Sequence, residues 1–193
     1  QSLRSANPLI SVRSFKNREI AVTAIVSALA ALGTMQILLV FSLLIQAPTW
    51  TGIGLGLTAT VAGLVKLPSN ISSILAGPLA GWITGKGGGR TALVAGALIT
   101  SLGWILAYFD TSSMVIVGGQ LILISFGTTM LFSVAPTIIA QSASPDRVSE
   151  ITGLLAVIRG MFMGIGAQIV TMILASDSIS SGSETYPTAQ AFQ

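Results

Sequence analysis

The stretch that decides the fold is Ile20–Ile45, IAVTAIVSALAALGTMQILLVFSLLI, which contains no charged residue. A transmembrane helix needs about 20 consecutive, mostly apolar residues, and this run is longer. In lipid a helix satisfies its own backbone hydrogen bonds, and the sequence lacks the alternating segments of a transmembrane barrel. We therefore expect an all-α, polytopic transmembrane helical bundle. Its helices are predicted over about 20–45, 53–83, 91–109, 114–140 and 151–174.

The basic residues are sorted by the side of the membrane. Seven of the nine lie before the first stretch or in alternate connections: Arg4, Arg13, Lys16, Arg18, Lys86, Arg90 and Arg147. The other connections hold Asp110, Asp177 and Glu184 and no basic residue. Cytoplasmic loops collect Lys and Arg. We therefore expect a multi-pass protein of the inner or plasma membrane, with residues 1–18 as a cytoplasmic lead-in and 176–193 as an extracytoplasmic tail.

Composition excludes several classes of function. Only 8% of the residues are charged and 52% are hydrophobic, whereas a soluble domain has about a quarter charged. The net charge of +3 does not indicate nucleic-acid binding, because the basic residues follow loop sidedness and no aromatic platform accompanies them. Without Cys or His, thiolate and imidazole metal sites, Cys nucleophiles and His triads are excluded. We expect no enzyme activity, no cofactor and no metal site.

Lys66 is the strongest candidate for a functional residue, because it lies near the middle of the second stretch. A charge at that depth costs several kcal/mol on insertion scales. Asn70 lies one helical turn further on the same face, as do Gly63 and Ser73. Such a polar stripe is typical of a substrate cavity. The alternative is a lysine that pairs with a neighbouring helix or extends to the interface.

Two further polar residues lie within apolar stretches. Arg159 is about two turns into the fifth stretch, where it would act as a gating residue or extend to the inner headgroups. Gln36 is the strongly polar residue deep in the first stretch, where it would face the substrate cavity. A hydrogen bond between helices, worth about 1 kcal/mol, explains Gln36 equally well.

The connection after the second stretch, Gly81–Arg90, reads GWITGKGGGR. It resembles the loop signature of the major facilitator superfamily, G-x-L-a-D-r-x-G-r-r, although Gly85 stands where the family usually has Asp. In the family this loop joins two helices of one half of the transporter and helps to lock the inner gate. The resemblance implies the same gating role for the matching residues, which are Gly81, Lys86, Gly88 and Arg90.

Three other segments resemble the same superfamily. The lead-in Asn7–Arg18 is similar to the approach to the second half of fourteen-helix DHA2 drug:proton antiporters. Arg159 and Gly166 match the R-x-L-G-G-A-x-G run of their penultimate helix, with Phe162 in place of its middle glycine. Tyr186–Gln193 is similar to the approach to a last helix. The resemblance implies five of the six helices of a carboxyl-terminal domain, and hence a fragment of a longer transporter.

The resemblance implies export of drugs or other small organic compounds by proton-coupled alternating access. The implied partners are the lipid bilayer, the substrate, protons and the amino-terminal half of the same transporter. No Asp or Glu lies in the five stretches, so the carboxylate that carries the proton is expected in the other half, or Lys66 itself releases it. Two alternatives remain: a transporter of small organic anions, and a truncated membrane module that does not transport.

Overall fold

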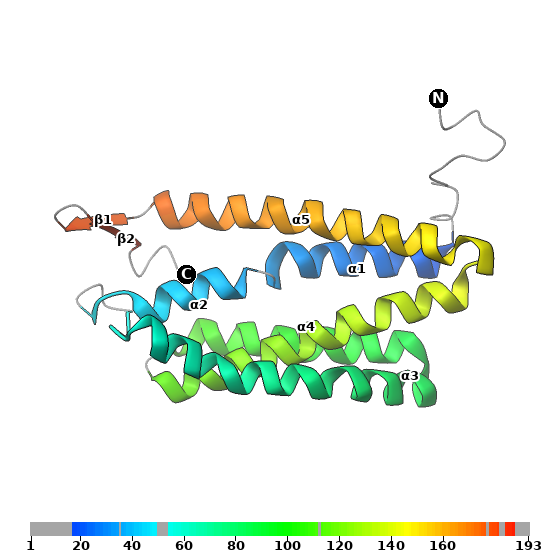
Figure 1. Ribbon diagram of the computed structural model, residues 1–193, viewed down its shortest axis with the longest axis horizontal. Helices are drawn as coiled ribbons and strands as arrows, with labels where there is room; N and C mark the ends of the chain where they lie inside the picture. Colours follow the sequence, from blue (N-terminus) through cyan, green and yellow to red (C-terminus); the bar gives the residue numbers. More distant parts are fainter. Residues whose placement is uncertain are drawn as a thin grey trace, which may run out of the picture.

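The computed structural model describes residues 17–34, 36–49, 54–111, 113–176, 178–181 and 184–187. Most of the expected lead-in, 1–16, and the end of the expected tail, 188–193, lie outside these ranges. The described chain is a bundle of helices, so the all-α fold class is confirmed (Figure 1). The helices are α1 (Arg18–Thr34), α2 (Ile37–Gln46), α3 (Ala59–Phe109), α4 (Met114–Ser142), the 3-10 helix η4 (Pro145–Arg147) and α5 (Val148–Ser176).

The first apolar stretch forms two helices, where the sequence predicted one over 20–45. Helix α1 ends at Thr34 and α2 begins at Ile37. Gln36 adopts a turn conformation between them, and its carbonyl accepts hydrogen bonds from the amides of Leu39 and Val40, both at 3.0 Å. The side-chain amide of Gln36 donates a hydrogen bond to the Met163 carbonyl of α5. This contact between helices lies at the break, and apolar periodicity alone does not reveal it.

Helix α3 begins at Ala59, later than the residue 53 expected from the apolar pattern. The chain before it, over 54–58, forms neither helix nor strand, and its amides hydrogen-bond to carbonyls at the end of α2. Leu55 donates to Leu44 at 3.2 Å, and Leu57 donates to Ile45 at 3.0 Å. These bonds satisfy helix-end carbonyls that would otherwise have no partner. The apolar residues from 54 to 57 therefore cap α2 rather than starting the next helix.

Helix α3 folds back on itself at Gly88, where φ is +81°. Figure 1 shows the two arms, before and after this residue, running antiparallel. The predicted connection over 84–90 is thus almost entirely helical, and one glycine makes the reversal because it adopts a positive φ without a Cβ penalty. Each arm has the roughly 20 residues that a crossing needs.

Three described helices are long and apolar enough to cross a membrane: Ala59–Phe109, Met114–Ser142 and Pro145–Ser176. The first of these contains two arms of crossing length, because of the reversal at Gly88. Helices α1 and α2 have 17 and 10 residues, so neither alone has the length of a crossing. Five crossings, with the first made by α1 and α2 together, remain a prediction.

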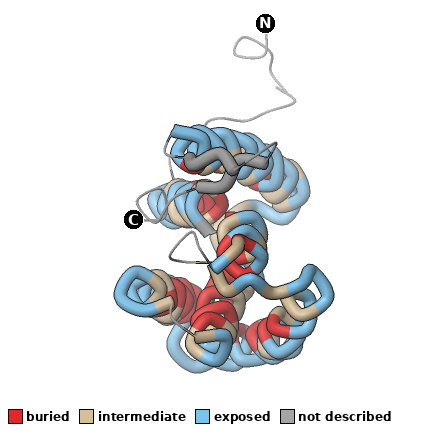
Figure 2. The backbone as a smooth tube through the Cα atoms, turned by 90° about the vertical axis from the view of Figure 1, so that its left-hand side faces the viewer, coloured by how far each residue is buried: buried red, intermediate tan, exposed pale blue. Residues whose placement is uncertain are grey.

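Helix α4 lies between α3 on one side and the pair α1 and α5 on the other (Figure 1). The buried residues face each other between helices, whereas the outer surfaces are exposed (Figure 2). One apolar cluster joins both arms of α3 to α4, and another joins α1, α4 and α5. The second cluster consists of Ile20, Ala24, Ala135, Ile139, Ile151 and Leu155.

The second arm of α3 and α4 make a close backbone contact through small residues. A Cβ atom on Gly127 would lie 2.6 Å from the Thr100 amide nitrogen and 2.7 Å from the Gly96 carbonyl oxygen. A Cβ atom on Gly96 would in turn lie 3.0 Å from the Gly127 carbonyl oxygen. Small residues let helix backbones approach closely in membranes, where van der Waals packing holds helices together. The sequence did not indicate that Gly96 and Gly127 make this contact.

The start of α1 is tied to the end of α4 by polar contacts. The Ser142 hydroxyl donates to the Glu19 carboxylate at 2.7 Å, and the Asn17 side-chain amide donates to the Ser142 carbonyl at 3.1 Å. Helix α4 extends to Ser142 and α5 begins at Val148, so the connection is shorter than the predicted loop. These contacts hold the two helix ends together at the end of the bundle where Gly88 also lies.

A two-stranded antiparallel sheet follows α5, in the segment expected as a polar tail. Strand β1 (Ser178–Ser181) pairs with β2 (Glu184–Pro187), and Ser181 is opposite Glu184. The sequence did not predict these strands. The last helix that the resemblance implies stays a prediction.

We expect Gly127→Ala to destabilise the bundle. The added methyl group would meet backbone atoms of α3, and such overpacking costs about 1–3 kcal/mol. Thermal unfolding of the purified full-length protein in detergent should show a lower Tm for this variant. Gly119→Ala on the same helix is the control, because a Cβ there meets no atom within 4 Å. Equal Tm values for the two variants would contradict the role of the crossing.

Candidate functional site

Lys66 lines a pocket of about 290 Å³ between α2 and the first arm of α3. The apolar part of the lining includes Ile37 and Phe41 of α2 and Leu121 of α4. Lys66 is half-buried, and no ion pair involving its ammonium group is present within the described residues. The pocket therefore offers a cation in largely apolar surroundings, which favours ligands that combine an apolar body with an anionic or hydrogen-bonding group.

Two polar side chains of α2 share this pocket with Lys66. The Gln46 side-chain amide donates to the Ser42 hydroxyl at 2.7 Å, and both residues line the pocket. Neither residue was predicted from the sequence as part of a site. Their spacing of four residues in an otherwise apolar helix places them on one face, and that is a signal by which they could have been found.

Asn70 lies one turn beyond Lys66 on α3 and is exposed. Ser73 lies on the same face, and its hydroxyl donates to the Ser69 carbonyl at 2.9 Å. The predicted polar stripe is therefore present on the first arm of α3. Whether it faces a substrate cavity remains a prediction.

The side chain of Gln36 lies at the contact between α1 and α5 and does not line the Lys66 pocket. It is 5% exposed, and its side-chain amide donates to the Met163 carbonyl at 2.9 Å. This is the hydrogen bond between helices that was the second interpretation of Gln36. Beside it, a Cβ atom on Gly166 would collide with the Leu32 carbonyl oxygen, so α5 approaches α1 closely just before α1 ends. The cavity role of Gln36 remains a prediction.

Arg159 of α5 packs against α4. Its guanidinium carbon lies 3.7 Å from the centre of the Phe132 ring. A cation over an aromatic face is attracted by the ring quadrupole, and the attraction is stronger away from water. The structure thus gives Arg159 a specific contact between two helices, and its gating role stays a prediction.

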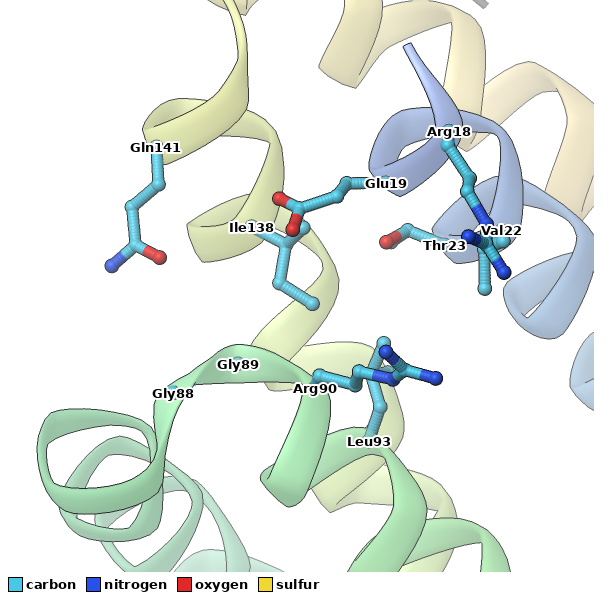
Figure 3. Close-up of a pocket in the computed structure, with 10 residues that line it drawn as sticks. All are labelled: Arg18, Glu19, Val22, Thr23, Gly88, Gly89, Arg90, Leu93, Ile138 and Gln141. Carbon is cyan, nitrogen blue, oxygen red and sulfur yellow. The ribbon is translucent and has the colours of Figure 1, made fainter.

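The Gly88 turn forms a second pocket, of about 420 Å³, with the start of α1 and the end of α4. Gly88 and Arg90 line it, together with Arg18 and Glu19 of α1 (Figure 3). The structure therefore brings two of the four predicted gating residues of this connection together with the beginning of the first helix. Glu19 was not selected from the sequence, and no local pattern indicates that it lines the same pocket as Arg90.

The other two predicted gating residues lie outside this pocket's lining. The Lys86 ammonium group lies 4.1 Å from the centre of the Trp82 ring, on the same helical arm. Gly81 is exposed, and a Cβ atom there would meet nothing within 4 Å. Within the described residues no group of three or more Asp or Glu side chains could hold a metal ion.

The long apolar helices and the bundle that they form define a multi-pass membrane protein. Two known sequences are similar to the chain: multidrug resistance protein Stp of Mycobacterium tuberculosis strain CDC 1551 / Oshkosh and the same-named protein of strain ATCC 25618 / H37Rv. Each is 25% identical to the chain over 176 residues. The match covers 90% of the chain, which spans only 31% of the relatives' length. No family profile and no solved structure matches.

Gly166→Ala is expected to disturb the contact between α1 and α5. The new methyl group would collide with the Leu32 carbonyl and would lie 3.0 Å from Nε2 of Gln36, so α5 must move outward. We expect a loss of about 1–3 kcal/mol in stability, measured as a lower Tm in detergent. Gly164→Ala on the same helix is the control, since a Cβ there meets nothing within 4 Å. A Tm for Gly166→Ala at or above that of the control would show that the close approach is unimportant.

Proposed function

We propose that the chain is one helical bundle of a secondary active transporter that exports drugs or other small organic compounds. The observation that carries the proposal is the match to a protein named for multidrug resistance, which is 25% identical to the chain and covers 90% of it. The resemblance of Gly81–Arg90 to the major facilitator signature supports it. Such transporters rock two bundles around a site near the middle of the membrane. Because the chain spans 31% of its relatives, a second bundle would come from the rest of the protein.

In this proposal the substrate binds beside the first arm of α3. Lys66 would supply a cation in the pocket with Ser42 and Gln46, and Asn70 would extend the polar wall. A charge inside a membrane span is costly and usually faces a bundle interior or a water-filled cavity. The opposite wall would come from the other bundle. Gln36 would then support the cavity from behind, by holding α5 against α1.

The gate in this proposal lies at the Gly88 turn and along α5. The end of the bundle that carries Arg18, Lys86 and Arg90 is rich in basic residues, which supports a cytoplasmic location in an inner or plasma membrane. Gly81 would allow another helix to approach closely. Arg159 would bias the gate through its contact with Phe132. Protons are the proposed coupling ion, with the titrating carboxylate in the other bundle.

A second candidate function is transport of small organic anions. The observation that favours it is the lining of the Lys66 pocket, which contains no acidic residue among those described. An uncompensated cation in apolar surroundings attracts an anionic group more strongly than it would in water. The same pocket would instead accept a carboxylate from the other bundle if the substrate is a cationic drug.

The first test is efflux of a fluorescent cationic dye from energised cells that express the full-length protein. We expect efflux that a protonophore abolishes, because the proposed transport is driven by protons. Lys66→Ala should lower the efflux rate about tenfold or more, the size expected for loss of one strong polar contact. The matched control is Arg147→Ala, which removes one positive charge from an exposed residue outside both the Lys66 pocket and the proposed gate, with expression equalised by blot.

Two results would contradict the proposal. If the wild-type protein moves no cationic dye but takes up or exchanges an organic anion in a manner dependent on Lys66, the second candidate function replaces the first. If Lys66→Ala transports as well as Arg147→Ala and the wild-type protein, the pocket at Lys66 is not the substrate site.

A further inference from the structure

We propose that the pocket at the Gly88 turn binds the phosphate group of an anionic membrane lipid. The pocket is lined by the first turn of α1, the last turns of α4 and the start of the second arm of α3 (Figure 3). These three segments lie far apart in the sequence and meet at one end of the bundle. Their side chains combine two guanidinium groups with an apolar wall, which is the chemistry of a lipid headgroup and its glycerol.

The two arginines are available to a ligand. Arg18 and Arg90 belong to different helices and both are exposed. Among the residues that the structure describes, neither guanidinium group has an ion pair or a hydrogen bond. A guanidinium group binds a phosphate through two parallel, charge-assisted hydrogen bonds. Two of them at one pocket therefore form a site for a single anionic phosphate.

The one acidic residue of the pocket lining does not neutralise these arginines. The Glu19 carboxylate accepts a hydrogen bond from the Ser142 hydroxyl at 2.7 Å. In Figure 3 this carboxylate turns toward α4 and away from the guanidinium groups. The pocket therefore carries a net positive charge on the side where Arg18 and Arg90 lie.

The apolar wall and the place of the pocket favour a lipid over a soluble ligand. Val22, Leu93 and Ile138 line the pocket beside the arginines, and Val22 is 47% exposed. The pocket lies at the ends of long apolar helices, which is the depth of lipid headgroups. The preceding segment 1–16 contains Arg4, Arg13 and Lys16 and no acidic residue, so its charge does not complement the pocket. Basic pockets between transmembrane helices bind anionic headgroups.

The test is a titration of the purified full-length protein in detergent with phosphatidylglycerol, with bound lipid counted by native mass spectrometry. We expect Arg18→Gln and Arg90→Gln each to weaken binding about tenfold, as for loss of a charge-assisted hydrogen bond. Lys86→Gln is the matched control, because it removes one positive charge at the same end of the bundle but outside the pocket lining. Both arginines are exposed, and an unchanged Tm would confirm that the variants fold.

Further arms separate the sources of the phosphate. Phosphatidylcholine carries the same phosphate without net charge, and we expect it to bind more weakly than phosphatidylglycerol. Soluble glycerol 3-phosphate should not displace the lipid at millimolar concentration. If it does, the ligand is a free phosphate and the lipid assignment is overturned. If Lys86→Gln weakens lipid binding as much as the arginine variants do, the binding reflects general surface charge and not this pocket. If lipid binding is unchanged in both arginine variants, the pocket is not the site.

Discussion

The close crossing of α3 and α4 is the contact on which the rest of the bundle depends. In lipid, burial of apolar side chains gives little drive for helix association, because the acyl chains are as apolar as leucine. Gly96, Thr100 and Gly127 let the two backbones come within van der Waals contact instead. Helix α4, held there, then presents its other face to α1 and α5.

This arrangement places two pockets of different chemistry in the bundle. The pocket at Lys66 lies between α2 and the first arm of α3 and offers one cation among apolar residues. The pocket at the Gly88 turn offers two guanidinium groups beside an apolar wall. A transported substrate crosses the membrane, whereas a bound lipid stays in one leaflet. The two ligands would therefore require different sites. The charges of the chain are few, and the different charged residues that line the two pockets suggest distinct roles.

Particular residues show how much of the structure could be predicted from the sequence. The apolar stretches predicted where helices form, and the unusual depth of Lys66 selected a residue that lines a pocket. Gln36 was selected as a polar residue in lipid, but its bond to Met163 joins positions 127 residues apart, which no local pattern contains. Ser42 and Gln46 carried a spacing signal that could have been used. No local pattern places Arg90, Arg18 and Glu19 at one pocket.

The sequence by itself determined that the chain is a helical membrane protein, because the length of uncharged apolar runs and the scarcity of charge are properties of composition and local order. It also determined that chemistry based on His or Cys is absent from these residues. Only the tertiary structure decided where the first stretch breaks, how late α3 begins and which charges share a pocket. Those features depend on contacts between helices, whose partners are set by packing in three dimensions and not by the neighbouring residues in the chain.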